Sequence, residues 1–129
     1  MSGEKNKLIL IIDDDPMMSR LFQVAISNAD MDVILAPNAD KGFEKLRKEK
    51  PDLLVLDLLL PGKNGIEILE EMRSDESIKN IPVIIFSSLD KDEYIDKLKE
   101  LNIVDFVIKS DIHPRQLVEK IQQYFSKNE

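Results

Sequence analysis

Residues 8–15 read LILIIDDD, an apolar run that ends abruptly in three aspartates. The same change recurs twice, because Leu53–Leu56 runs into Asp57 and Phe106–Ile108 runs into Lys109. Each run is continuously apolar, which is typical of a strand covered on both faces in a parallel sheet. Ligands bind such sheets in the crevice outside the carboxyl ends of the strands. Several carboxylates and one ammonium group at those ends therefore predict a site for a cation and a phosphate.

Two more apolar runs, Val33–Ala36 and Val83–Phe86, lie at similar intervals, and the last run extends back to Ile103. Segments with helical spacing of apolar residues separate the runs. The alternation predicts an α/β protein, a (βα)5 doubly wound sheet with right-handed crossovers and helices on both faces. The expected apolar stripes are Met18, Leu21, Phe22, Ala25 and Ile26; Ala39, Phe43 and Leu46; Ile66–Met72; Tyr94, Leu98 and Leu101; and Leu117, Ile121, Tyr124 and Phe125.

Polar residues mark the helix ends. Asn64 with Glu67, and Asp90 with Glu93, have the spacing of a capping box. Asn102 stands where a helix would end in a left-handed residue.

Other residues have simple structural interpretations. Asp15 and the only histidine, His113, each precede a proline at an expected first helical position, so both are read as helix-start residues. Met17 and Met18 are expected on the helix face and in the core.

Composition narrows the functional classes. The 129 residues carry a net charge of −7, which argues against direct binding to a nucleic-acid backbone. The absence of cysteine excludes disulfides and thiolate metal sites. The polar start lacks the apolar stretch of a signal peptide, and no run approaches the roughly 20 apolar residues that span a bilayer. We therefore expect a cytoplasmic protein without membrane insertion.

The aspartates at the strand ends need a counterion. If the first and third strands are neighbours, Asp13, Asp14 and Asp57 lie together, and each like-charge pair at about 5 Å repels by roughly 3 kcal/mol. Mg²⁺ suits such a site, because it prefers a few carboxylates, keeps several waters and coordinates phosphate oxygen. Ser87 and Lys109 follow two other strands, where a hydroxyl and an ammonium group can meet a phosphoryl group.

Four stretches follow one another along the chain: LILIIDDD (8–15), DLLVLDLLLPGKNG (52–65), PVIIFSS (82–88) and DFVIK (105–109). Together and in this order they resemble the receiver domain of two-component response regulators. The resemblance implies a flavodoxin-like fold with strand order 2-1-3-4-5. It places the receiver domain at residues 8–126, after a polar leader of residues 1–7 and before a frayed end of residues 127–129.

The resemblance also implies a ligand set for Mg²⁺. Asp14 and Asp57 would bind the ion directly, Asp13 would bind it through water, and Leu59 would add its backbone carbonyl. Asp57 is implied to be the exposed carboxylate that acts as nucleophile.

The phosphoryl group has its own implied residues. Asp57 is the phosphoacceptor, Ser87 the switch hydroxyl and Lys109 the phosphate-binding lysine. Phe106 stands at the position of the aromatic whose rotamer follows activation, although an ordinary packing role explains it nearly as well.

Departures from the family pattern lie beside this site. The family usually has proline after the lysine, whereas Ser110 follows here, so a trans bond is expected. Ser88 replaces a smaller residue. Leu59 and Leu89 add apolar bulk, which we expect to hinder the attacking water and to lengthen the phosphoryl lifetime.

The sequence therefore predicts a stand-alone, Mg²⁺-dependent switch that catalyses only its own phosphorylation and dephosphorylation. Its expected partners are a sensor histidine kinase or phosphotransfer protein and a downstream protein, with the switch monomeric or dimeric on phosphorylation. One alternative is a small haloacid-dehalogenase-like phosphohydrolase with Asp13 as nucleophile and Asp15 as acid, but it leaves Asp57 without a role. A binding-only pseudo-receiver is the other, and the intact set of five polar site residues argues against it.

Overall fold

Five parallel strands form one sheet in the order β2-β1-β3-β4-β5 in the computed structural model, which describes residues 6–88 and 94–128. This confirms the doubly wound (βα)5 fold and its strand order. The strands are β1 (Leu8–Ile12), β2 (Asp32–Ala36), β3 (Leu53–Asp57), β4 (Val83–Ser87) and β5 (Asp105–Ile108).

Two of the polar site residues lie inside strands rather than after them. Asp57 pairs with Phe86 as the last residue of β3, and Ser87 closes β4 opposite Ile108. The last strand starts two residues later than the apolar run suggested. Asn102 adopts a left-handed φ of 56°, as expected, and this turn delays the start of pairing.

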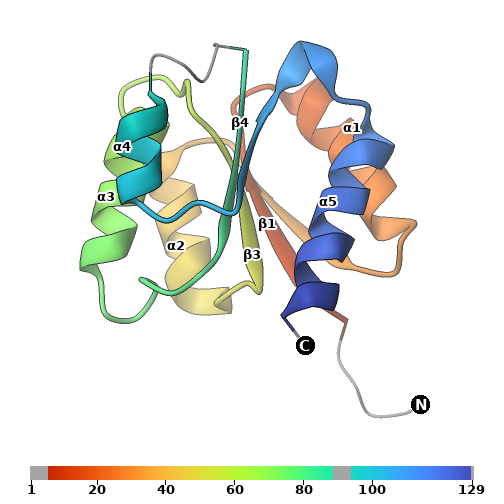
Figure 1. The fold of residues 1–129 in the computed structure, drawn as a ribbon, viewed down its shortest axis with the longest axis horizontal. Coiled ribbons are helices and arrows are strands. Elements are labelled where there is room, and N and C mark those ends of the chain that lie inside the picture. Colours follow the sequence, from red (N-terminus) through yellow and green to blue (C-terminus); the bar gives the residue numbers. More distant parts are fainter. Residues whose placement is uncertain (1–5, 89–93, 129) are drawn as a thin grey trace.

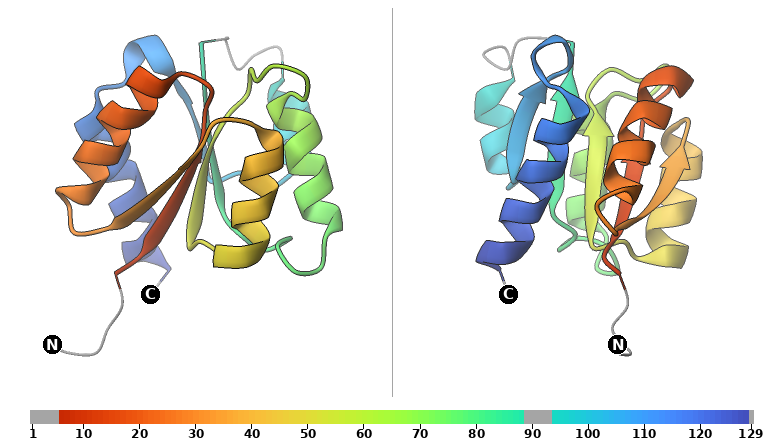
Figure 2. Two further views of the ribbon diagram at one scale, coloured as in Figure 1. Left: turned by 180° about the vertical axis from the view of Figure 1, so that it is seen from behind. Right: turned by 90° about the vertical axis from the view of Figure 1, so that its right-hand side faces the viewer.

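Helices cover both faces of the sheet, with α1 and α5 on one side and α2, α3 and α4 on the other (Figures 1 and 2). The two faces bury separate apolar clusters, because successive strand residues point to opposite sides. None of the described helices has the length and apolar character needed to cross a membrane. Their bounds are α1 (Pro16–Ser27), α2 (Ala39–Glu49), α3 (Gly65–Ser74), α4 (Ile95–Glu100) and α5 (Pro114–Lys127), with a short 3-10 helix η2 (Lys109–Asp111) after β5.

The predicted helix starts are confirmed for the residues that the structure describes. Asn64 and Glu67 form the predicted capping box of α3. Asp15 caps α1, since its carboxylate accepts hydrogen bonds from the amides of residues 17 and 18. His113 caps α5, accepting the Arg115 amide at its Nδ1 (3.1 Å). The second predicted capping box, at residues 90 and 93, lies outside the described residues.

The predicted apolar stripe of α1 is wrong at one position. The sequence predicts Leu21 on the buried face of the helix, yet its side chain is 51% exposed. Met17 is 75% exposed. The core is instead contacted by Phe22 and Ile26, while Ser19 occupies the buried position one turn earlier. Through Ser19, the buried face of α1 contacts Asp13 at the end of β1.

Candidate functional site

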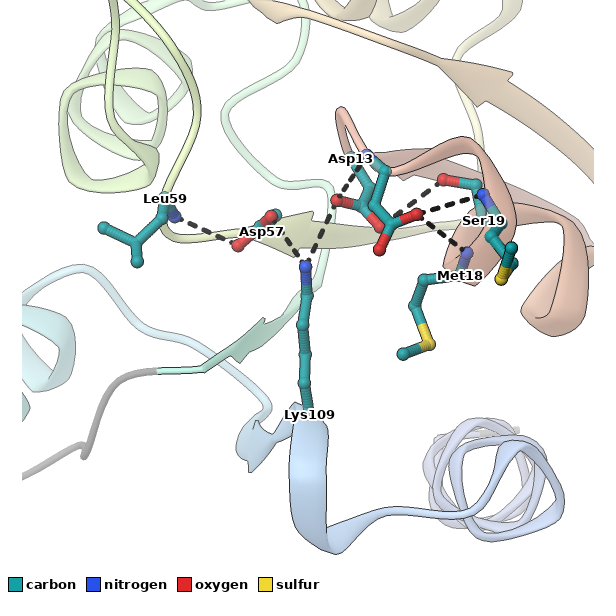
Figure 3. A network of polar contacts seen from close by, with 8 residues as sticks. Asp13, Met18, Ser19, Asp57, Leu59 and Lys109 are labelled. Atoms are coloured by element: carbon teal, nitrogen blue, oxygen red, sulfur yellow. Dashed lines mark hydrogen bonds and ion pairs between the residues drawn. The ribbon is translucent and has the colours of Figure 1, made fainter.

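The carboxyl ends of β1, β3 and β5 bring two carboxylates and one ammonium group into contact. The Lys109 Nζ lies 2.9 Å from Asp57 Oδ2 and 3.3 Å from Asp13 Oδ1, between the two aspartates (Figure 3). These ion pairs are shielded from solvent, because the side chains of Asp13, Asp57 and Lys109 are 0%, 3% and 17% exposed. Three residues that are far apart in sequence thus form one buried charge network.

Asp14 completes a set of three carboxylates that fits a hard divalent cation. Oxygen atoms of Asp13, Asp14 and Asp57 all lie within 4.8 Å of one another. Asp14 is exposed while the other two are buried, so the set opens to solvent on one side. Oxygen donors with an open side suit Mg²⁺, which binds through a few carboxylates and keeps several of its waters.

Asp57 is not the exposed carboxylate that the sequence led us to expect. The residue is only 2% exposed. Its Oδ1 accepts the Leu59 amide at 3.0 Å and its Oδ2 accepts Lys109, so both oxygens are held. A cation or phosphoryl donor must therefore displace Lys109 to reach the carboxylate fully.

The pKa of Asp57 is raised from 3.8 to about 6, chiefly because the carboxylate is buried. The hydrogen bond with Asp13 also raises this pKa, while the hydrogen bonds from Lys109 and from the Leu59 amide lower it. Burial alone would lower the pKa of Lys109. The hydrogen bonds and charges of the two aspartates outweigh that effect, so its pKa is raised. The ammonium group is thus held charged, and it also lies 4.9 Å from the centre of the Phe86 ring.

Asp13 is held from three sides. Its Oδ1 accepts the Asp15 amide (3.2 Å) as well as Lys109, and its Oδ2 accepts the buried Ser19 hydroxyl (3.4 Å). Sequence reasoning missed Ser19. Its position three residues before the buried Phe22 and seven before Ile26 places it on the inner face of α1, which helical periodicity would have shown.

The remaining predicted residues surround this network. Ser87, wholly buried, lies beside Ile108 in the sheet, one residue before Lys109. Phe106 is partly buried and packs against the core beneath α2, α3 and α4. The peptide bond between Lys109 and Ser110 is trans, as expected.

Apolar bulk is also present at the rim. The Leu59 side chain, two residues after Asp57 in the chain, is 43% exposed. Ser88 is exposed as well. Leu89, which was expected to flank the site from the other side, lies outside the described residues.

Proton and metal ion should compete for this site. In the metal-free protein, Asp57 binds a proton below about pH 6. We expect Mg²⁺ affinity to be greatest above that pH and to fall about tenfold for each pH unit below it, as one proton must leave. Titrating Mg²⁺ at pH 5 to 8 by isothermal calorimetry measures this. In Asp57→Asn the decrease in Mg²⁺ affinity near pH 6 should disappear. A wild-type Mg²⁺ affinity that stays constant from pH 5 to 8 would contradict the prediction.

The chain resembles known proteins over nearly its whole length. The response regulator receiver domain family matches residues 9–122. The alkaline phosphatase synthesis transcriptional regulatory protein PhoP of Bacillus subtilis is 32% identical over 126 residues, covering 96% of this chain and 50% of that protein. The chain therefore spans about half the length of that relative.

Solved structures give the same picture. A receiver domain protein from Methanospirillum hungatei superposes with a TM-score of 0.86 at 24% identity, covering 95% of this chain and 96% of that one, which shows the fold. The phosphorylated cyanobacterial phytochrome response regulator RcpA superposes with a TM-score of 0.82 at 28% identity, covering 96% of each chain.

Proposed function

This chain belongs to the response regulator receiver domain family, and on that premise we propose that it is a phosphorylation-controlled switch that accepts a phosphoryl group on Asp57. The observation that carries this proposal is the Lys109–Asp57 contact of 2.9 Å inside a three-carboxylate set. A similar structure described as phosphorylated, that of RcpA, supports it.

In the proposed reaction an Asp57 oxygen attacks the phosphorus of a phospho-histidine and the bond to the imidazole nitrogen breaks. The product is an acyl phosphate. Lys109 transfers its contact from the carboxylate to a phosphoryl oxygen, which keeps a positive charge beside the developing negative charge. Mg²⁺ would supply further positive charge when held by Asp13, Asp14, Asp57 and the Leu59 carbonyl.

The signal would pass through two residues near the phosphoryl group. Ser87 is expected to move its hydroxyl onto a phosphoryl oxygen. Phe106, which packs on the side of α4, is expected to repack with it. This is a population shift between two arrangements of the α4 and β5 surface.

The proposed donor is a sensor histidine kinase or a histidine phosphotransfer protein in the cytoplasm. The output is contact with another protein or onward relay, by a monomer or a phosphorylation-dependent dimer. That the unit acts as a stand-alone switch is part of the proposal, since the relative PhoP is about twice the length of this chain.

Incubation with Mg²⁺ and acetyl phosphate tests the proposal against its rivals. A receiver gains the mass of one phosphoryl group, stable in acid and labile in base. Rapid phosphate release that requires Asp13 would indicate a phosphohydrolase. Absence of any mass gain would indicate a binding-only module.

An apolar stripe on α1 suggests where the phosphodonor protein docks. Met17, Leu21 and Val24 are 75%, 51% and 45% exposed, and the spacing of four and three residues places them on one helix face. We expect Leu21→Glu to lower kcat/KM for transfer from a phospho-histidine protein at least tenfold, since an apolar contact is replaced by a charge. Labelling by acetyl phosphate should not change. Val104→Glu, at an apolar site 36% exposed near the start of β5, is the matched control.

Leu59 is expected to protect the acyl phosphate. Its exposed side chain stands at the rim, while its amide is bonded to Asp57. Replacing it with asparagine introduces a group that can orient water, so we expect dephosphorylation to be several-fold to tenfold faster. Loss of the labelled species is followed by mass spectrometry after acetyl phosphate is removed. Leu59→Met, which keeps the apolar bulk, should decay like the wild type, and equal rates for asparagine and leucine would refute the idea.

A further inference from the structure

A hollow of about 580 Å³ lies at the edge of the sheet opposite the aspartates and is lined in part by the C-terminal half of α5. This volume is within the range of small-molecule sites, which is about 300 to 1,000 Å³. The hollow is separate from the acidic site, because all five strands are parallel and their amino ends form this edge. We call it the Arg73 pocket; it is lined by Arg73, Lys79, Asn80, Ile81, Pro82, Asn102, Ile103, Val104, Asp105, Lys120, Gln123, Tyr124 and Lys127.

The pocket is basic although the protein is acidic. Four cationic side chains and one carboxylate line it, in a chain of net charge −7. The carboxylate, Asp105, is already paired with Lys120 at 2.7 Å. Within residues 6–88 and 94–128, neither Arg73 nor Lys127 takes part in an ion pair. Two positive charges therefore have no ion-pair partner among the residues that the structure describes.

Arg73 is the more unusual of the two, because its guanidinium group is partly buried among neutral acceptors. It donates to the backbone carbonyls of Leu101 (2.8 Å), Lys79 (2.9 Å), Ile81 (2.9 Å) and Asn102 (3.2 Å). A guanidinium has five N–H donors, so one is left without a partner among the described residues. Burial lowers the pKa of Arg73. Partly buried charges are normally paired, and an anion entering this pocket would satisfy the group.

The rest of the lining combines three amide side chains, Asn80, Asn102 and Gln123, with apolar residues and one aromatic ring. Ile81 and Pro82 precede β4, Ile103 precedes β5, and Tyr124 faces the same hollow from α5. Such a wall can cover a flat ring, while Arg73 and Lys127 pair with an anionic group. We propose that the Arg73 pocket binds a small molecule that joins a phosphate or diphosphate group to a flat ring.

Binding of ADP, pyrophosphate and adenosine to the ¹⁵N-labelled chain tests this inference by NMR. The titrations are run in EDTA, so that the three aspartates hold no metal to attract phosphate. We expect ADP to shift amides in residues 79–82, 101–105 and 120–127, with an affinity at least about fivefold higher than either fragment alone. No shifts up to about 5 mM ADP would overturn the proposal. So would shifts confined to Asp13, Asp57 and Lys109, or equal affinity for ADP and pyrophosphate.

Lys127→Gln is the diagnostic variant. Loss of its charge should weaken ADP binding about tenfold without disturbing the fold. Lys48→Gln is the matched control, because Lys48 also lies exposed in the last turn of a helix, α2, and is not among the residues that line the pocket. Equal affinity of Lys127→Gln and the wild type would overturn the proposal, as would an equal loss in Lys48→Gln.

Discussion

Replacing Asp57 with asparagine should abolish phosphoryl uptake, lowering the rate of labelling by acetyl phosphate at least about a thousandfold. The asparagine side chain has nearly the shape of the carboxylate. Its oxygen can still accept the backbone N–H of Leu59, which lies 3.0 Å from Asp57 Oδ1 in the wild type. It lacks the charge that makes the oxygen a nucleophile. Intact-protein mass spectrometry measures the adduct.

Asp13→Asn is the discriminating control. In a receiver it weakens cation binding and slows labelling, but the adduct still forms because Asp57 remains. If Asp13→Asn eliminated the adduct while Asp57→Asn retained it, the chemistry would be that of a phosphohydrolase with Asp13 as nucleophile. Labelled protein should also lose its adduct in hydroxylamine, as an acyl phosphate does.

The fold could be predicted because its signals are local. A strand buried on both faces must be continuously apolar, and β1, β3 and β4 show this directly, with 0% exposure from Ile9 to Ile12. The meeting of Asp13, Asp57 and Lys109 could be predicted in the same way, since each of these charges stands at the end of an apolar run. Strand order was supplied by the family resemblance rather than by periodicity.

What could not be predicted depends on contacts between distant segments. Asp57 is buried at the end of an inner strand, and Lys109, 52 residues later in the chain, donates to its Oδ2. Leu21 is exposed because the buried face of α1 is formed by Ser19, Phe22 and Ile26, and the apolar stripe of the sequence does not show which of its members face the sheet. The Arg73 pocket is formed by four segments that are separate in the sequence, so no local sequence pattern predicts it.

Replacing Lys109 with methionine should lower the free energy of unfolding by about 3 kcal/mol in EDTA at pH 7, because two buried carboxylates lose their shared cation. Chemical denaturation measures the change. Lys120→Met is the matched control. It breaks the Lys120–Asp105 pair, whose side chains are each 38% exposed, so the loss there should stay below about 1 kcal/mol.

A double-mutant cycle shows whether the effect of Lys109 is electrostatic. If it is, Lys109→Met combined with Asp57→Asn should recover at least half of the stability lost by Lys109→Met alone, since one of the uncompensated charges is gone. Mg²⁺ should likewise stabilise Lys109→Met more than the wild type, because the ion and the ammonium group compete for the same oxygens. Additive losses in the cycle, within about 0.5 kcal/mol, would instead mean that Lys109 acts through its packing on Phe86. The charge pair proposed to govern phosphoryl binding would then contribute little to the resting state.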